Sequence, residues 1–417
     1  MGFDRGLWGD HNSVLAAGNM SVPPHLAPPV SHAVVIVLGD LGRSPRMLNH
    51  ARALLARGWR VTLAGYAENA LPPDLAQHPL LKTWDLAAGG AGRLRAWWGL
   101  ARRLRADDSW RLVVVQNPPG FPALWALPWR LQGREVALDW HNLGASLYAL
   151  ARPSAGLSTK IYALCERLAA RRATTVWAVS AALARSVSPT ATVLADAPSA
   201  VLCAAAVAPR DRLVWWRRVL PDQPPPPADA VWIVAPSSWG ADEDHEAILH
   251  VARYWAAHAA DWGAEVRPVV FIATGRGAAR DAFVQEAARL PAGPVSVRTA
   301  WLPPEEYPVM LAAADAGLCL HRSSSGLDLP MKLVDMRGAG LPALVLDYGP
   351  VLRETFVEGG DGWLFKNDAE LAGRIHDIVT QRGSLKKSSD GVETWEARWD
   401  RLLGPWCAVL ETKGAGS

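Results

Sequence analysis

The sequence contains little cysteine and no long apolar run. Its four cysteines are widely spaced among 417 residues, with no Cys-x-x-Cys pair and no histidine-rich partner segment. This pattern gives neither a disulfide framework nor a zinc site, and free thiols in a reducing compartment are the natural interpretation. No stretch reaches the roughly 18 uninterrupted apolar residues that suggest a membrane-spanning helix. The first 30 residues also lack the apolar core of a signal peptide.

Charge of one sign is also missing, since 43 basic and 40 acidic residues leave a formal charge of only +3. A dominant nucleic-acid footprint is therefore excluded, and no nucleic-acid partner is expected. Half of the residues are apolar and 20% are charged, which excludes a disordered or fibrous chain. The length exceeds what one ordinary core accommodates and predicts two domains.

Short apolar runs alternate with helical patterns in both halves of the chain. They fall at residues 33–38, 59–64, 111–115, 135–139 and 175–179, and again at 231–235, 269–273, 295–298, 316–320 and 343–346. Continuous apolar runs flanked by turn residues are typical of strands buried on both faces of a parallel sheet. We therefore predict an α/β protein with two Rossmann-like, doubly wound domains that face a cleft.

Composition also suggests where the domains begin and end. Residues 1–31 are proline-rich and irregular, and we interpret them as a flexible leader. The first Rossmann-like domain is predicted over 32–196 and the second over 230–392. Between them, 197–229 loses the strand–helix rhythm and carries five prolines near its end, which indicates a linker. A helical pattern in 393–417, interrupted at Gly404 and Pro405, is expected to pack back on the first domain.

The strongest local signal follows the strand pattern at 316–320 and leads into a helix near Pro330. Three consecutive serines and a glycine before a helix predict a nest of hydroxyl and backbone N–H groups that binds an anion. Lys332 in the first helical turn can reach a diphosphate, and Asp335 on the same face can accept ribose hydroxyls. The residues assigned to this site are Ser323, Ser324, Ser325, Gly326, Leu327, Asp328, Lys332 and Asp335. The alternative is an ordinary capped helix with a solvated lysine and aspartate.

A second strand-to-helix turn contains Gly39, Asp40, Gly42 and Arg43. Glycine turns are common between strands and helices, so the motif is weak by itself, but it lies in the first loop of the first domain. Its glycines and arginine are assigned to the same ligand site. Asp40 is the best-placed candidate for a general base, and the alternative is a carboxylate that caps the helix.

Other polar residues end predicted strands, where the sites of α/β proteins form. His141, between Asp139 and Asn142, is the second candidate for a catalytic base. Arg276 follows a strand of the second domain and is suited to contact phosphate. Ser237 is assigned to the ligand site, and the acidic cluster that follows it at 242–244 is most simply a helix N-terminus.

Residues 94–105 form a basic, tryptophan-bearing amphipathic pattern. One interpretation is a helix in a membrane interface, with Trp97 and Trp98 at the headgroups and Arg102 and Arg103 facing anionic lipid. The alternative is a surface helix that packs its apolar stripe on the sheet of its own domain.

Six segments together point to a known family. They are GDLGRSPRM (39–47), QNPP (116–119), DWHN (139–142), SSWGADED (237–244), WLPPEEYP (301–308) and HRSSSGLDLPMKLVDMRGAGLP (321–342). In this order they resemble the chitobiosyldiphosphodolichol β-mannosyltransferases, the first mannosyltransferases of N-glycan precursor assembly. The resemblance covers most of residues 33–380.

The resemblance implies the two-domain glycosyltransferase architecture called GT-B, with GDP-mannose as donor and dolichyl-diphosphate chitobiose as acceptor. It implies an inverting reaction that forms a β-1,4 bond on the cytosolic face of the endoplasmic reticulum membrane. Other mannosyltransferases of the same assembly are implied partners. No metal is assigned, and a divalent cation remains a stimulant without a ligand site.

Two departures from the family pattern stand out. Family members carry an N-terminal transmembrane anchor that this sequence does not show. Residues 194–198 keep Asp196 and Pro198 of a family segment but lack its tyrosine and arginine. Two other hypotheses stay open: a nucleotide-sugar epimerase or hydrolase on the same fold, and a non-catalytic subunit of the glycosylation complex.

Overall fold

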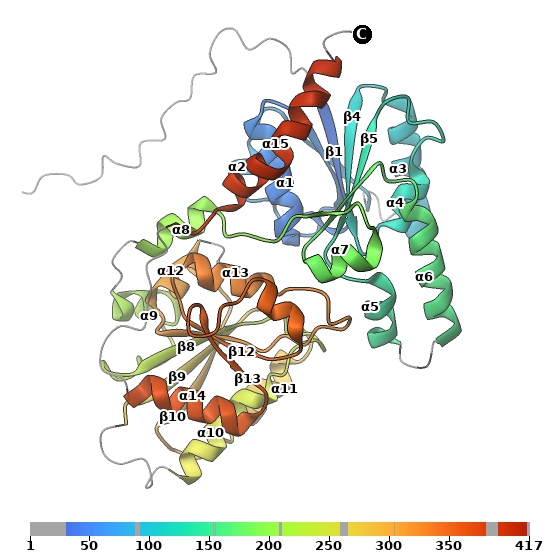
Figure 1. The fold of residues 1–417 in the computed structure, drawn as a ribbon. Coiled ribbons are helices and arrows are strands. Elements are labelled where there is room, and N and C mark those ends of the chain that lie inside the picture. The colour runs from blue at the N-terminus through green and yellow to red at the C-terminus, as the bar shows by residue number, and fades with distance from the viewer. Residues whose placement is uncertain are drawn as a thin grey trace, which may run out of the picture.

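The computed structural model describes residues 31–87, 92–152, 154, 156–207, 211–258, 266–303, 305–380 and 391–414. Two parallel sheets, each covered by helices on both faces, form two domains (Figure 1). The strand order is β3-β2-β1-β4-β5-β6-β7 in the first sheet and β10-β9-β8-β11-β12-β13 in the second. The predicted fold class, two doubly wound Rossmann-like domains, is confirmed.

The first sheet contains β1 (His32–Asp40), β2 (Arg60–Tyr66), β3 (Leu81–Asp85), β4 (Trp110–Asn117), β5 (Glu135–Trp140), β6 (Thr175–Ala178) and β7 (Thr192–Val193). Its helices are α1 (Pro45–Ala56), α2 (Pro73–Ala76), α3 (Arg93–Ala106), α4 (Phe121–Ala126), α5 (Gly144–Ala151), α6 (Gly156–Ala170) and α7 (Ala181–Val187), with a 3₁₀ turn at Leu41–Arg43. Val35 and Val37 of β1 face one core with α1, and Val34 and Ile36 face another with α3 and α4. Both faces of β1 are thus buried, which is why its sequence is continuously apolar.

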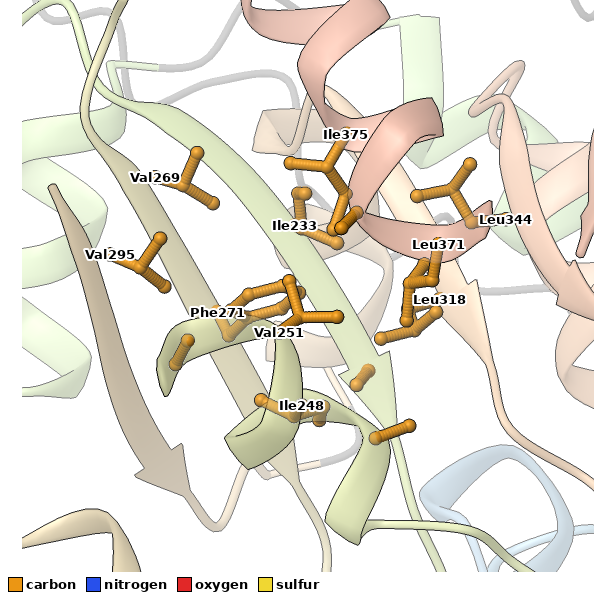
Figure 2. Close-up of a cluster of buried hydrophobic side chains, with 14 of the residues drawn as sticks. Ile233, Ile248, Val251, Val269, Phe271, Val295, Leu318, Leu344, Leu371 and Ile375 are labelled. Carbon is orange, nitrogen blue, oxygen red and sulfur yellow. The ribbon is translucent and has the colours of Figure 1, made fainter. Parts of the chain in front are cut away.

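The second sheet contains β8 (Val231–Pro236), β9 (Val269–Thr274), β10 (Val295–Ala300), β11 (Ala316–Cys319), β12 (Ala343–Leu346) and β13 (Gly362–Phe365). Its helices are α10 (Glu246–Ala257), α11 (Arg280–Ala287), α12 (Glu306–Ala313), α13 (Met331–Gly338) and α14 (Asp368–Thr380), with a 3₁₀ turn at Pro350–Glu354. Figure 2 shows Ile233, Phe271 and Leu318 of the sheet beneath Val251 of α10 and Ile375 of α14. This close-packed apolar layer holds the strands of the sheet in place. The loops that follow the carboxyl ends of these strands are therefore well positioned.

The expectation of a linker over all of 197–229 is wrong. Two helices, α8 (Ala200–Val207) and α9 (Arg212–Val219), occupy this region. Trp215 and Trp216 of α9 are fully buried and pack against Trp232 of β8, so α9 belongs to the second domain. The prolines that suggested a linker lie after α9, at 221 and 224–227.

The last described helix, α15 (Trp395–Gly414), lies against the first domain, beside α1 (Figure 1). Its buried residues join the core of the first sheet: Trp395, Trp399, Leu403, Cys407 and Leu410. The predicted break at Gly404 and Pro405 is wrong, because the helix continues through both residues. Packing of one face along the domain outweighs the single backbone hydrogen bond that a proline removes.

Helix α3 packs its predicted apolar stripe on its own domain. Leu100, Ala101 and Leu104 are fully buried, and the Trp97 indole N–H donates to the Pro122 carbonyl at 2.6 Å. Trp97 is thus half-buried and held to its own domain, and its assignment as a membrane contact stays a prediction. Leu94, Trp98, Arg102 and Arg103 are exposed, so the later part of the stripe packs on the domain while its first residue lies in solvent.

Candidate active site

A cavity of about 230 Å³ lies between the carboxyl ends of the two sheets. His141, which follows β5, and Arg43 line it from the first domain. Ser324 and Asp328, which follow β11, line it from the second. The structure thus brings together four residues assigned from the sequence, although the two pairs lie more than 180 positions apart along the chain. Polar groups from two domains that converge on one cavity are the usual form of a ligand site in this class of fold.

The serine loop between β11 and α13 is held by its own hydroxyl groups. Ser323 Oγ contacts the Asp328 carboxylate and accepts from the backbone N–H groups of Gly326, at 2.7 Å, and Ser325, at 3.3 Å. Ser325 Oγ accepts from Leu327 N–H at 3.2 Å, and Gly326 has a positive φ of 70° that suits glycine. The expected anion nest differs from this arrangement, because its N–H groups are engaged inside the loop. Of the three serines, Ser324 lines the cavity.

The same loop ties the two domains together. Ser325 Oγ donates to Asn142 Oδ1 at 2.8 Å, and Asn142 Nδ2 donates to Ser324 Oγ at 3.4 Å. Ser324 also lies 3.0 Å from the hydroxyl of Ser146 at the start of α5. These contacts close the cavity on the side of the serine loop.

The acidic residues at 242–244 have a different role from the one expected. Helix α10 begins later, at Glu246, and its N-cap is His245. Asp242 lies 3.4 Å from His321, while Glu243 contacts Lys332 and Asp244 contacts Arg322. The cluster therefore forms a row of ion pairs with the segment that follows β11, and it does not serve the helix dipole.

Glu243 is the most buried member of this row and organises its surroundings. Its Oε2 accepts from Ser237 Oγ at 2.6 Å and from the backbone N–H groups of Ser238 and Trp239 at 2.9 and 3.1 Å. Burial lowers the pKa of Lys332 to about 8, and the nearby charge of Asp242 opposes this shift only in part. Ser237 and Lys332 are both assigned to the ligand site. In this structure both side chains contact Glu243.

His321 lies between two carboxylates and lines the cavity. Its Nδ1 is 3.4 Å from Asp242 and its Nε2 is 2.9 Å from Asp328. Burial by itself lowers the pKa of His321, but the two carboxylates outweigh it and raise the pKa to about 9. A protonated imidazole therefore faces the cavity at neutral pH. His321 is not among the residues assigned from the sequence, although its place directly after a buried strand was a usable signal.

This pair of contacts predicts a loss of stability at alkaline pH. A histidine whose pKa rises from 6.5 to about 9 on folding stabilises the folded state fully below pH 6.5, and the contribution disappears as the pH rises through 9. Replacing His321 by asparagine should therefore destabilise the protein at pH 6.5 and have a much smaller effect at pH 9. Urea unfolding of both proteins at each pH measures the difference. A difference that stays constant with pH contradicts the assignment of a charged His321.

His141 differs from His321 in protonation. Burial lowers the pKa of His141, so its imidazole is neutral at pH 7 and has a nitrogen lone pair available. Its Nε2 lies 3.5 Å from Nε2 of Gln116, which is the penultimate residue of β4 and also lines the cavity. The buried Oε1 of Gln116 has no hydrogen-bond partner among the described residues. The cavity is thus lined by a neutral base, His141, and by the amide of Gln116, whose oxygen is able to accept a hydrogen bond from a ligand.

Asp40 caps the turn that follows β1. Its Oδ1 accepts from the backbone N–H groups of Gly42 and Asn69 at 3.3 and 3.0 Å, and its Oδ2 accepts from Asn69 Nδ2 at 2.6 Å. A side chain at Gly42 would approach Ala70 O within 2.7 Å, so this glycine permits close packing of two loops. A Cβ at Gly39 would meet only Val37, at 3.6 Å, so packing does not require glycine there. The geometry shows the capping role of Asp40, and its role as a base stays a prediction.

Two assigned arginines meet on one aromatic ring. The Arg276 guanidinium lies 4.1 Å from the centroid of the Trp301 ring, and the Arg43 guanidinium of the other domain lies 5.8 Å from it. Asp335 lies elsewhere on α13, where its Oδ2 accepts from the Tyr307 hydroxyl at 3.0 Å. Burial raises the pKa of Asp335 to about 7. Contact of Asp335 with a ribose stays a prediction.

A buried network of charged residues borders the cavity, and its pairing is not predictable from the sequence. Arg46 of α1 donates to Asp139 through Nε and Nη2, at 2.6 and 2.7 Å, and to Asp196 through Nη1 at 2.6 Å. His50 Nε2 lies 3.2 Å from Asp139, which is fully buried. Arg46 holds the pKa of Asp139 far below its usual range despite burial. Asp139 is thus a structural neighbour of His141 that fixes the end of β5.

Within the described part of the chain, no group of three or more His, Cys, Asp or Glu side chains is arranged to hold a metal ion.

Comparison with known proteins agrees with this architecture. The model of the family described as "Glycosyl transferase 4-like domain" matches residues 42–190. A Yarrowia lipolytica protein named chitobiosyldiphosphodolichol beta-mannosyltransferase is 32% identical over 405 residues, which cover 89% of this chain and 85% of the relative. The chain belongs to the chitobiosyldiphosphodolichol β-mannosyltransferase family. It is therefore a glycosyltransferase.

Two further similarities extend this family assignment. An Arabidopsis thaliana protein named UDP-glycosyltransferase TURAN is 30% identical and matches 92% of this chain and 99% of its own length. A glycosyltransferase structure from Rickettsia africae superposes with a TM-score of 0.62 at 12% identity, covering 93% of this chain and 99% of that chain. This likeness concerns the fold alone. This chain thus has the GT-B fold, and a nucleotide sugar is the class of its donor.

Proposed function

We propose that the protein transfers mannose from GDP-mannose to dolichyl-diphosphate chitobiose and forms a β-1,4 bond with inversion. The observation that carries the proposal is the cavity between the domains, in which neutral His141 faces protonated His321. One group is suited to accept a proton and the other to stabilise negative charge, as a transfer from a nucleoside diphosphate requires. The name of the Yarrowia lipolytica relative supports this choice of acceptor.

His141 acts as the base in this proposal. The 4-hydroxyl oxygen of the acceptor attacks C1 of mannose while its proton passes to the imidazole, and the bond from C1 to the diphosphate oxygen breaks. Geometry favours His141 over Asp40, because His141 lines the cavity whereas both Asp40 oxygens are engaged by Gly42 and Asn69. Gln116 beside His141 positions the imidazole or the sugar with its amide.

The departing diphosphate needs positive charge. Arg43, His321 and Arg322 line the cavity and supply it, and Arg276 lies near Arg43 on Trp301. Charged hydrogen-bond donors in a site shielded from water stabilise a developing anion more than they do in solution. These residues come from both domains, so the positive site around the leaving group depends on how the two domains pack together.

A donor role of Lys332 is separable from its pairing with Glu243. We expect Lys332→Met to raise KM for GDP-mannose about ten- to a hundredfold, since a charge-assisted hydrogen bond is worth roughly 1.5–3 kcal/mol. The same substitution in a Glu243→Gln background removes the unpaired carboxylate and serves as the control. Steady-state kinetics of the four proteins measure the effect. If KM in the double variant equals that of the parent, Lys332 does not bind the donor and serves only to pair with Glu243.

Mannose transfer is tested with radiolabelled GDP-mannose and a lipid-linked chitobiose acceptor. The expected product is a labelled lipid-linked trisaccharide whose mannose is released by a β-mannosidase and not by an α-mannosidase. Incubation without acceptor tests the epimerase or hydrolase hypothesis, since either enzyme consumes the donor alone. Absence of both transfer and GDP binding supports a non-catalytic subunit and contradicts the proposal.

The proposed place of action is the cytosolic face of the endoplasmic reticulum membrane, where other mannosyltransferases of the same assembly are proposed partners. A lipid-linked acceptor requires the enzyme to work at a bilayer. Among the described residues, no helix combines the length and the apolar content needed to cross one. Contact with the membrane through a surface of the folded domains is therefore part of the proposal.

A further inference from the structure

Helix α6 exposes an apolar stripe to solvent. The stripe consists of Leu157, Ile161, Leu164 and Leu168, whose exposed fractions are 76, 54, 49 and 44%. Their spacing of four, three and four residues places them on one face of the helix. Basic residues flank this face, since Lys160, Arg167 and Arg171 are also exposed.

The inward face of α6 is unusual for a surface helix. It buries Glu166 and Ala169, and leucine and isoleucine side chains point away from the domain. Glu166 accepts from Asn117 Nδ2 at 2.9 Å and from the backbone N–H of Gly144 at 3.1 Å, which holds the helix in this orientation. An ordinary amphipathic helix turns its apolar stripe to the core. The outward stripe of α6 therefore lacks its partner in this chain's described residues.

Neighbouring elements extend the apolar surface. Leu147 and Leu150 of α5 are exposed, and α5 packs against α6 (Figure 1). Trp125 of α4 and Trp129 after it are exposed too, Trp129 to 89%, and α4 packs between α6 and α3. We call these eight residues, six on α5 and α6 and two tryptophans, the α5–α6 surface. Tryptophan is enriched where an apolar layer meets water, as at bilayer headgroups.

Charge separates this region from the rest of the protein. The segments 93–106, 121–134 and 144–172 hold twelve basic residues and one acidic residue, the buried Glu166. The remaining chain holds 31 basic and 39 acidic residues and is therefore net negative. A basic, apolar and tryptophan-bearing surface is complementary to a bilayer with anionic headgroups.

We propose that the α5–α6 surface docks on an anionic lipid bilayer. Leu147 belongs to this surface and also lines the cavity between the domains. If the proposed function holds, on which this step rests, the docked protein presents the mouth of its cavity to a sugar carried on a membrane lipid. The docking surface is α6 with α5 and the two tryptophans, and α3 adds the exposed Leu94, Trp98 and arginines at its margin.

Flotation with vesicles tests the docking without any sugar substrate. The vesicles are phosphatidylcholine alone or phosphatidylcholine with 30% phosphatidylserine, a composition on the order of an anionic leaflet. The double variant Leu157→Gln/Ile161→Gln keeps the helix-forming tendency of α6, and we expect it to bind anionic vesicles at least roughly tenfold more weakly. The matched control is Val214→Gln/Val409→Gln, two exposed valines on α9 and α15, which should bind as the parent does.

Added salt should weaken binding of the parent protein, because the basic residues contribute to it. Equal flotation of the parent and the α6 variant, or no flotation of the parent, overturns the proposal. A parent dimer that the α6 substitutions convert to monomers, seen by light scattering, also overturns it and assigns the surface to a second copy of the chain. Flotation without mannose transfer leaves the docking intact and contradicts the proposed function alone.

Discussion

Replacing His141 by alanine should lower kcat for mannose transfer by about 10²- to 10⁴-fold, the usual contribution of a positioned general base. The substitution removes the neutral imidazole that lines the cavity and leaves the ion pairs around His321 in place. KM for GDP-mannose should change little, because the donor diphosphate is expected near Arg43 and His321. In the parent, the acidic limb of the pH–rate profile should lie below pH 6.5, since burial lowers the pKa of His141.

Asp40→Asn is the matched comparison, since Asp40 is the other candidate for the base. Asparagine retains an oxygen that accepts from Gly42 N–H but does not accept a proton at neutral pH. We expect this variant to keep kcat within about tenfold of the parent, less than the loss of a general base. A severe loss for Asp40→Asn with a mild one for His141→Ala would reverse the assignment.

Replacing Arg46 by methionine should reduce the free energy of unfolding by about 3–5 kcal/mol, the usual cost of removing one partner of a buried ion pair. Asp139 is fully buried and would lose both of its arginine hydrogen bonds, and Asp196 would lose a third. Urea unfolding at pH 8 measures the effect, because burial lowers the pKa of His50 and leaves it neutral there.

Arg52→Met provides the control on the same helix. Arg52 pairs with Asp74 at 2.7 Å in an exposed position, so its loss should cost less than about 1 kcal/mol. The double variant Arg46→Met/Asp139→Asn should recover part of the stability, since it removes the uncompensated charge. Equal stability of the Arg46 and Arg52 variants would show that the buried network contributes no more than a surface pair.

The elements predicted correctly are those that show their apolar pattern within a short, continuous stretch of the sequence. The strand β1 is a continuous apolar run because both of its faces are buried. The strand β8 of the second domain is apolar for the same reason. The short strands β3 and β13 were missed: Lys82 and Thr83 of β3 are exposed, and β13 contains only four residues. Helix α9 was missed because the prolines that follow it dominated the composition of the region.

Candidate site residues were found where they follow predicted strands, as His141 and Ser324 do. Their partners were not predictable from spacing. Lys332 meets Glu243 across 89 positions of the chain, and Arg46 meets Asp139 across 93. Both contacts depend on how the loops at the ends of two sheets pack. The exposure of the apolar stripe of α6 was not predictable, because a periodic pattern does not show which way a helix faces.

The packing of α15 on the first domain makes that domain discontinuous along the chain, and this affects the order in which the protein forms during synthesis. Trp395 and Trp399 complete the core beneath β1, yet the ribosome makes them after the whole second domain. The second sheet and its helices are continuous in sequence, so they are able to fold first. Until α15 emerges, the first domain exposes the apolar face of α1 to the chaperones of the cell. Truncation at the C-terminal end of the chain should therefore damage the N-terminal domain.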